Sequence, residues 1–213
     1  MFAKDRDLLI LEPNIFRDGV FLTQRLSCGE GDISESLLSA SDTDVGFDAA
    51  GVDTGHVVVV DEIAYEVLER QSVSDLVISR LRPRRDGTVV QPSPATQAAV
   101  CVATYAPQLE AAHQAVLRMA GIETSGQIVP GAPKEAMICN PEAFIPVECL
   151  HALAAIYNAL GAGQPADAPA NQRSVAYQRR FEAESERVLV HLDMNGDGVP
   201  DAVRRLAGGP MVR

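Results

Sequence analysis

The apolar residues of this 213-residue chain change their spacing once, across a proline-rich segment at 83–94. Before that segment, short β-branched runs at 56–60, 64–69 and 76–81 lie close together, which is typical of strands in a small meander or barrel-like sheet. After it, apolar residues recur every three to four positions, which is typical of amphipathic helices. The sequence therefore predicts an α+β protein in which an N-terminal β-rich region is followed by a helical bundle.

Three helices are predicted in the second part of the chain, at 108–119, 146–160 and 172–192. The predicted organisation is a β-rich region at 1–82, a linker at 83–95, a helical bundle at 96–192 with an internal linker at 161–170, and a turn with an extended C-terminal tail at 193–213. Segment 98–105 fits either a strand or the first turns of a helix, and this organisation assigns it to the bundle.

Composition excludes some classes of function. The chain has 29 Asp and Glu against 18 Lys and Arg, a net charge of −11, which argues against a basic nucleic-acid-binding protein. Acidic residues are concentrated in the first part of the chain. Residues 1–80 include 16 acidic and six basic side chains, whereas residues 171–213 include six acidic and seven basic side chains. No run of eighteen apolar residues occurs, so we expect no transmembrane helix and no membrane partner.

The four cysteines are widely spaced and form no CxxC pair, so we expect them to be reduced and mostly buried as small apolar residues. Nucleophile-elbow, zincin, phosphate-loop and dinucleotide patterns are all missing from the sequence, and we expect no enzymatic activity. An unrecognised hydrolase stays open as an alternative. It would gather His113, His151 or Cys149 with an acidic residue in one pocket.

The predicted helix at 172–192 is rich in Arg and Glu and has a thin apolar stripe. Its members are Tyr177, Phe181, Val188 and Leu192. A charged helix with so narrow a stripe buries little surface by itself, so we expect these four residues to pack against a partner.

The clearest local pattern is DMNGDGVPD at 193–201. Asp193, Asn195, Asp197 and Asp201 occupy positions 1, 3, 5 and 9 of a calcium-loop pattern, which makes them candidate metal ligands. Position 12 is Arg204, where such a loop needs a bidentate glutamate. Two interpretations stay open: a structural Ca²⁺ site, or a metal-free turn in which Asn and Asp side chains bond the backbone.

Arg82, Arg84 and Arg85 form a basic cluster in the proline-flanked segment. Such a cluster contacts phosphate or, more commonly, is solvated or paired with neighbouring carboxylates. The second interpretation is the one we expect here.

The order of segments along the chain resembles that of the head-to-tail connector (adaptor) proteins of tailed bacteriophages and gene transfer agents. The resemblance covers most of the chain and is carried by LLILEPNIFRD at 8–18, GHVVVV at 55–60, LVISRLR at 76–82, TYAPQL at 104–109, LRMAGI at 117–122 and LDMNGDG at 192–198.

This resemblance implies a virion structural protein. Copies of the chain would form a ring, usually of twelve, beneath the portal protein, and the ring would link capsid to tail and line the DNA channel. It would also contact a downstream neck or tail protein, and double-stranded DNA would pass through without specific binding. The protein would lie in the virion neck, and in the host cytoplasm during assembly. Another neck component, such as a stopper, and a calcium-dependent binding module remain alternatives.

Within such a connector, the four stripe residues of the charged helix would form the ring interface. The C-terminal tail would dock into the portal, with Arg204, Arg205, Leu206 and Arg213 as candidate contacts. No cofactor is expected apart from the possible structural Ca²⁺.

Overall fold

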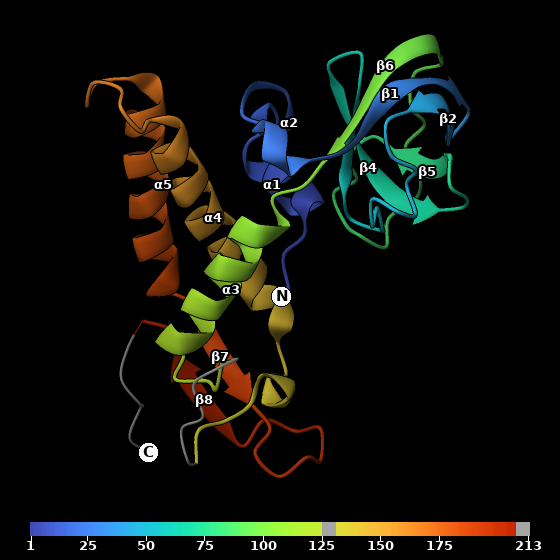
Figure 1. Ribbon diagram of the computed structural model, residues 1–213. Coiled ribbons are helices and arrows are strands. Elements are labelled where there is room, and N and C mark those ends of the chain that lie inside the picture. The colour runs from blue at the N-terminus through green and yellow to red at the C-terminus, as the bar shows by residue number, and fades with distance from the viewer. Residues whose placement is uncertain (125–130, 208–213) are drawn as a thin grey trace. The chain divides into compact units, whose positions relative to one another are not determined.

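The computed structural model describes residues 1–124 and 131–207. It divides into two compact units, shown in Figure 1: Lys4–Ala106, called the barrel unit here, and Pro107–Arg213 together with Met1–Ala3, called the helical unit. Helices and strands both contribute substantially, so the predicted α+β class is confirmed.

The barrel unit is built around strands that close on themselves. Within the described residues, six antiparallel strands form a barrel in the order β1-β2-β5-β4-β3-β6. Their bounds are β1 Arg25–Ser34, β2 Leu37–Thr43, β3 Val57–Val60, β4 Ile63–Arg70, β5 Asp75–Ser79 and β6 Ala95–Ala103. Two short helices, α1 (Asp5–Leu11) and α2 (Ile15–Asp18), precede them, with a 3₁₀ turn at Leu22–Gln24.

Alternate residues of these strands fill the barrel interior, as the period of two requires. The core includes Val58, Val60, Tyr65, Val67, Leu76, Ile78, Val100 and Val102. Strand β1 closes the barrel by pairing with β6, and Cys28 lies directly opposite Cys101 in this pairing. The positions of these two cysteines therefore depend on the closure itself.

The helical unit contains α3 (Ala106–Met119), α4 (Ile145–Leu160), α5 (Pro169–Ser185) and a hairpin of β7 (Leu189–Leu192) and β8 (Ala202–Arg205). Short 3₁₀ turns at Glu135–Met137 and Pro141–Phe144 precede α4. Pro146 occupies the first turn of α4, where its missing N–H costs no helical bond. Helices α4 and α5 lie side by side (Figure 1).

The boundary between the units differs from the predicted linker at 83–95, because β6 belongs to the barrel. Segment 96–105 was assigned to the helical bundle, but most of it is a strand held between β1 and β3. Its small, weakly patterned residues favour neither state locally, so the two neighbouring strands decide. Residues 7–11, in the part predicted as strands and turns, form a helix instead.

The charged helix also ends earlier than predicted. The predicted helix 172–192 is corrected to α5, which stops at Ser185, and Val188 and Leu192 belong to the hairpin segment that follows. The predicted extended tail is corrected for residues 202–205, which form β8 and pair with β7. Residues 208–213 lie outside the described residues.

One helical stretch of the described chain, Pro141–Leu160, is long and apolar enough to cross a membrane by length and composition, with a hydropathy of 1.4. It contains α4, whose apolar residues point in most directions. Val147, Leu153 and Ile156 are almost fully buried in the helical unit, which is the pattern of a core helix.

Candidate functional site

The four predicted ring-interface residues are buried inside the subunit. Tyr177 and Phe181 of α5 pack on α4, where Tyr177 stacks on Tyr157 at 5.7 Å between ring centroids and Phe181 lies edge-on to His151 at 4.8 Å. Val188 and Leu192 are buried as well. Tyr177 and Phe181 form the intrachain seam of the helix pair, and Val188 and Leu192 are buried in the hairpin segment, so the expectation that these four side chains meet a neighbouring copy is corrected.

The outer face of the same helix pair carries a groove of about 520 Å³. Helix α4 contributes the small residues Ala154 and Ala155 together with His151, and α5 contributes Val175 and Arg179. Ala155 and Val175 are exposed, although both are apolar. Because burial is the main effect on His151, its pKa lies below the ordinary value, so the imidazole is neutral at pH 7. The groove thus has both apolar and polar lining residues.

The 193–201 segment is the turn of the β7–β8 hairpin. The Asp193 carboxylate accepts backbone N–H bonds from Asn195, Gly196 and Gly198 at 3.2, 2.6 and 2.7 Å. These bonds, the one from Gly198 first, hold the pKa of Asp193 below its usual value. Asp197 accepts the Val199 N–H at 2.8 Å.

The remaining candidate ligands are also bonded within this turn. The side-chain oxygen of Asn195 accepts the Asp197 N–H at 2.9 Å, and Asp201 accepts the Met194 N–H at 3.0 Å. Among the described residues, no group of three His, Cys, Asp or Glu side chains is arranged to hold a metal ion. In this turn the carboxylates and the Asn195 side chain satisfy backbone donors, and the Asn195 amide also bonds Asp197 and Asp201 at 3.2 and 3.4 Å.

The candidate portal-docking residues lie around the hairpin. Arg205 is exposed and Arg204 is half-buried, both on β8. Leu206 is fully buried, and its N–H donates to the Val188 carbonyl at 3.0 Å, so a role for its side chain in docking is corrected to one in the core. Arg213 lies outside the described residues.

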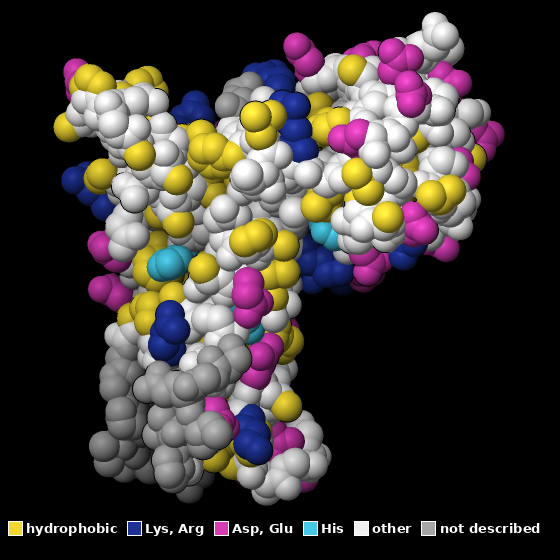
Figure 2. All heavy atoms as spheres, viewed as in Figure 1, with side chains coloured by type: hydrophobic (Ala, Val, Ile, Leu, Met, Phe, Trp, Pro, Cys, Tyr) yellow, Lys and Arg dark blue, Asp and Glu magenta, His cyan; other side chains and the backbone are white. Residues whose placement is uncertain are grey.

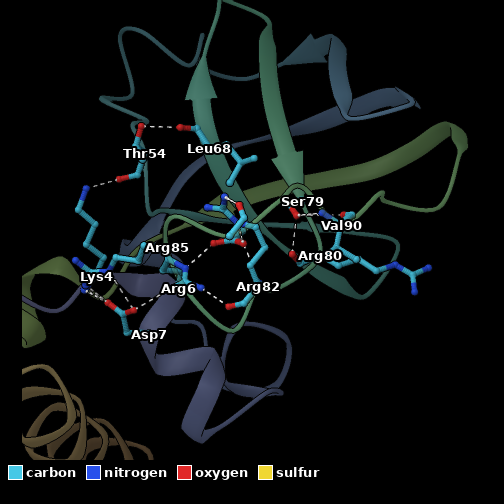
Figure 3. A network of polar contacts seen from close by, with 12 residues as sticks. Lys4, Arg6, Asp7, Thr54, Leu68, Ser79, Arg80, Arg82, Arg85 and Val90 are labelled. Carbon is cyan, nitrogen blue, oxygen red and sulfur yellow. Dashed lines mark hydrogen bonds and ion pairs between the residues drawn. The ribbon is translucent and has the colours of Figure 1, made fainter. Parts of the chain in front are cut away.

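The arginines of the basic cluster are paired with carboxylates. Figure 3 shows the network that contains Arg82 and Arg85. Glu66 of β4 is fully buried, and it accepts bonds from Nε of Arg6 at 2.5 Å and from Nε of Arg82 at 2.6 Å. Arg85 pairs with Asp7 of α1, and Arg84 pairs with its neighbour Asp86 at 3.1 Å. These side chains tie α1 and the 80–86 segment to the barrel wall, which is a structural role.

Asp5, at the start of α1, is a second buried carboxylate in the barrel unit. Burial raises its pKa to about 6, although it accepts bonds from the Thr104 hydroxyl and the Tyr105 N–H, both at 2.7 Å. These two bonds attach the start of α1 to the end of β6. The sequence contains no local signal for this contact, because the partners are about 100 positions apart.

In the helical unit, His113 and Glu148 form a buried pair. His113 Nδ1 lies 2.7 Å from Glu148 Oε1, and the second oxygen of Glu148 accepts the backbone N–H of Ala3 at 2.8 Å. Burial lowers the pKa of His113, but the hydrogen bond and charge of Glu148 outweigh it, and the pKa lies above its usual value. The pair holds residues 1–3 against α3 and α4.

The three candidates of the hydrolase alternative lie apart from one another, although the α4–α5 groove contains His151 together with Glu182. His113 bonds to Glu148, His151 contacts Phe181 in the α4–α5 groove, and Cys149 is buried in α4. Cys139 is exposed.

The other two cysteines form a disulfide, which corrects the expectation that all four are reduced. Cys28 of β1 is bonded to Cys101 of β6, 73 positions away in the sequence. The bond lies in a second groove, of about 630 Å³, on the outside of the barrel. The cysteine spacing alone cannot reveal this pair, because the register of barrel closure brings the two strands together.

Acidic side chains are concentrated on the barrel unit, which holds 17 Asp and Glu against nine Lys and Arg. Figure 2 shows many of them on its visible surface. The remaining residues hold 12 and nine. The charge asymmetry seen along the sequence is therefore also an asymmetry between the two folded units.

Comparisons with protein-family models, with curated proteins and with solved structures find no match to this chain.

Proposed function

We propose that the protein is a head-to-tail connector of a tailed bacteriophage or gene transfer agent. Copies of the chain form a ring beneath the portal, link the capsid to the tail and line the channel through which DNA passes. The order of segments along the sequence supports this assignment, from LLILEPNIFRD at 8–18 to LDMNGDG at 192–198. In this proposal the barrel unit is the N-terminal β-rich region of the connector, and the helices of the helical unit form the bundle of the ring.

The observation that carries the proposal is the groove on the outer face of α4 and α5. A cyclic ring is built from heterologous contacts, in which one surface of a subunit receives a different surface of its neighbour. Exposed Ala155 and Val175 give the groove apolar surface, and Arg179 and Glu182 give it charges of both signs. Protein interfaces commonly combine apolar and polar surface in this way.

Charge supports the channel role. DNA binds proteins largely through phosphate neutralisation and counterion release, which an acidic surface does not provide. The barrel unit carries a net charge of −8, so DNA passes it without adhering. Arg204 and Arg205 of the hairpin supply positive charge for the portal contact.

The first experiment is the mass of the purified protein by light scattering, alone and with the portal protein of the same virus. A ring, or a monomer that becomes a ring on the portal, is the expected result. A protein that stays monomeric with the portal contradicts the proposal. A ring that binds an adaptor ring but not the portal identifies a stopper instead.

Two matched variants test whether this groove is the interface between neighbouring copies in the ring. Ala155 lies in the groove and Ala159 lies one turn further along α4, outside the groove lining, and both alanines are exposed. Ala155→Glu puts a charge among the apolar residues that line the groove. This variant is expected to form no ring, while its circular dichroism spectrum is unchanged. Ala159→Glu is expected to leave the ring intact. Equal behaviour of the two variants would rule out this groove as the interface.

A further inference from the structure

The disulfide Cys28–Cys101 lies in the groove on the outside of the barrel, at the seam where β1 meets β6. Both cysteines are only partly buried, and both line the groove. Val59 of β3 and Ala99 of β6 add apolar surface beside them. The groove of about 630 Å³ therefore gives a small molecule access to a sulfur–sulfur bond.

Charged side chains of both signs surround this bond. Arg17 of α2 and Arg25 of β1 line the groove, as do Asp61 and Glu62 of the β3–β4 turn, and all four are exposed. Asp61 is fixed in place, because its carboxylate accepts the Ala99 N–H at 3.0 Å. A molecule that carries both carboxylate and ammonium groups would find partners for each of them here.

We propose that this groove is a thiol–disulfide exchange site for a small zwitterionic thiol. The thiolate of the small molecule attacks one sulfur of the Cys28–Cys101 bond. A mixed disulfide forms there, and the bonding electron pair leaves on the other cysteine as a thiolate. A second small thiolate then attacks the small-molecule sulfur of the mixed disulfide. It releases the oxidised small molecule and leaves two protein thiolates, so each step exchanges one disulfide for another and the thiol is the reductant.

The barrel holds its closure through this reaction by backbone pairing. Gly29 pairs with Val100 and Ser27 with Val102, on either side of the cysteines. Strand β6 is also paired with β3 along its other edge. The exchange therefore changes the chemistry of the groove without removing either strand from the sheet.

The test follows the exchange in the full-length protein, isolated in air-equilibrated buffer. Glutathione serves as the zwitterionic probe and 2-mercaptoethanol, which has no charged group besides its thiolate, as the reference, at equal thiolate concentrations. Samples are quenched in acid and examined by intact mass and by peptide mapping. The expected product is one glutathione on Cys28 or Cys101. Absence of that adduct, or finding both cysteines as free thiols in the isolated protein, overturns the proposal.

Variants that reverse one charge distinguish recognition of the charged groups of the thiol from simple access to the disulfide. Arg25→Glu is expected to lower the ratio of the glutathione to the 2-mercaptoethanol rate constant roughly fivefold, as loss and reversal of an exposed ion pair imply. Arg80→Glu changes an exposed arginine of the barrel unit outside the groove lining and is expected to leave this ratio unchanged. An unchanged circular dichroism spectrum verifies that each variant is folded. If Arg25→Glu slows both thiols equally, or slows neither, recognition by charge is refuted.

Discussion

Glu66 shows how a single residue organises the barrel unit. Its carboxylate is fully buried, and both of its oxygens accept charge-assisted bonds, one from Arg6 and one from Arg82. A buried carboxylate of this kind is tolerated only because both of its oxygens have charged hydrogen-bond donors. Breaking a buried pair leaves a charge without compensation, which costs far more than the pair contributes when intact.

Replacing this carboxylate therefore has a large expected effect. Glu66→Gln leaves Arg6, which is only 4% exposed, with Asp7 as its remaining counter-charge and removes the counter-charge of Arg82 in this network. We expect the free energy of unfolding to fall by about 3–5 kcal/mol. Urea denaturation measures this change. Glu69→Gln, on the exposed part of the same strand, is the matched control and should change the value by less than about 0.5 kcal/mol. Similar losses in the two variants would show that the network does not stabilise the fold.

Asp5 gives the barrel unit a pH dependence of known sign. Its pKa is raised from 3.8 to about 6 by burial, so the folded state binds more protons than the unfolded state between these values. The contribution of Asp5 to the free energy of unfolding is therefore present below pH 4 and is lost as the pH rises through 6. We expect the stability of Asp5→Asn relative to the wild type to increase by up to about 3 kcal/mol between pH 4 and pH 7. Denaturant unfolding at both pH values measures it, and a pH-independent difference would contradict the raised pKa.

At the scale of elements, the hairpin turn at 193–201 is held by side chains that bond their own backbone. Asp193 accepts three backbone N–H groups, and Gly196 and Gly198 adopt positive φ values of 82° and 83°. These conformations suit glycine, and the carboxylate satisfies donors that would otherwise be left to water. These side-chain bonds therefore hold the turn in the conformation seen here, and we expect it to form without an ion.

Amide hydrogen exchange tests this interpretation. Asp193→Ala is expected to speed exchange at Gly196 and Gly198, while the amides of α4 stay protected. Addition of Ca²⁺ to the wild-type protein is expected to leave the amide spectrum of the turn unchanged. Saturable shifts confined to 193–201 on addition of Ca²⁺ would instead assign a cation site to Asp193, Asn195, Asp197 and Asp201.

At the scale of the whole molecule, the chain is two units with different stabilising devices. The barrel unit contains a disulfide that spans 73 residues, whereas Cys139 and Cys149 of the helical unit form none. A cross-link of that span restricts the unfolded chain and is worth about 4 kcal/mol in the loop-entropy account.

Calorimetry with and without a phosphine reductant tests whether the disulfide stabilises only the barrel unit. We expect the unfolding transition of the barrel unit to move to lower temperature on reduction, by an amount equivalent to about 4 kcal/mol or less. The transition of the helical unit should not move. The double variant Cys28→Ser with Cys101→Ser is the control, and it should be insensitive to the reductant. A reductant effect on both transitions would show that the units unfold as one.

Much of the local structure could be predicted from the sequence. The helix expected at 108–119 lies within α3, and the one expected at 146–160 lies within α4. Both predictions relied on apolar spacing together with glycine and proline punctuation, which act within a few residues. The end of α5 was missed, because Val188 and Leu192 continue the helical spacing, whereas the Val188 carbonyl accepts the Leu206 N–H and Leu192 pairs with Ala202 in the hairpin.

The sequence by itself determined the α+β class, the acidity of the first half and the two main core helices, because these depend on composition and on contacts close in the chain. Tertiary structure alone decided the closed barrel, the Cys28–Cys101 bond and the burial of Glu66 between two arginines. The residues joined by barrel closure, by the disulfide and by the Glu66 network lie 16 to 78 positions apart. No local pattern encodes such pairs, since strand register and barrel closure fix which side chains meet.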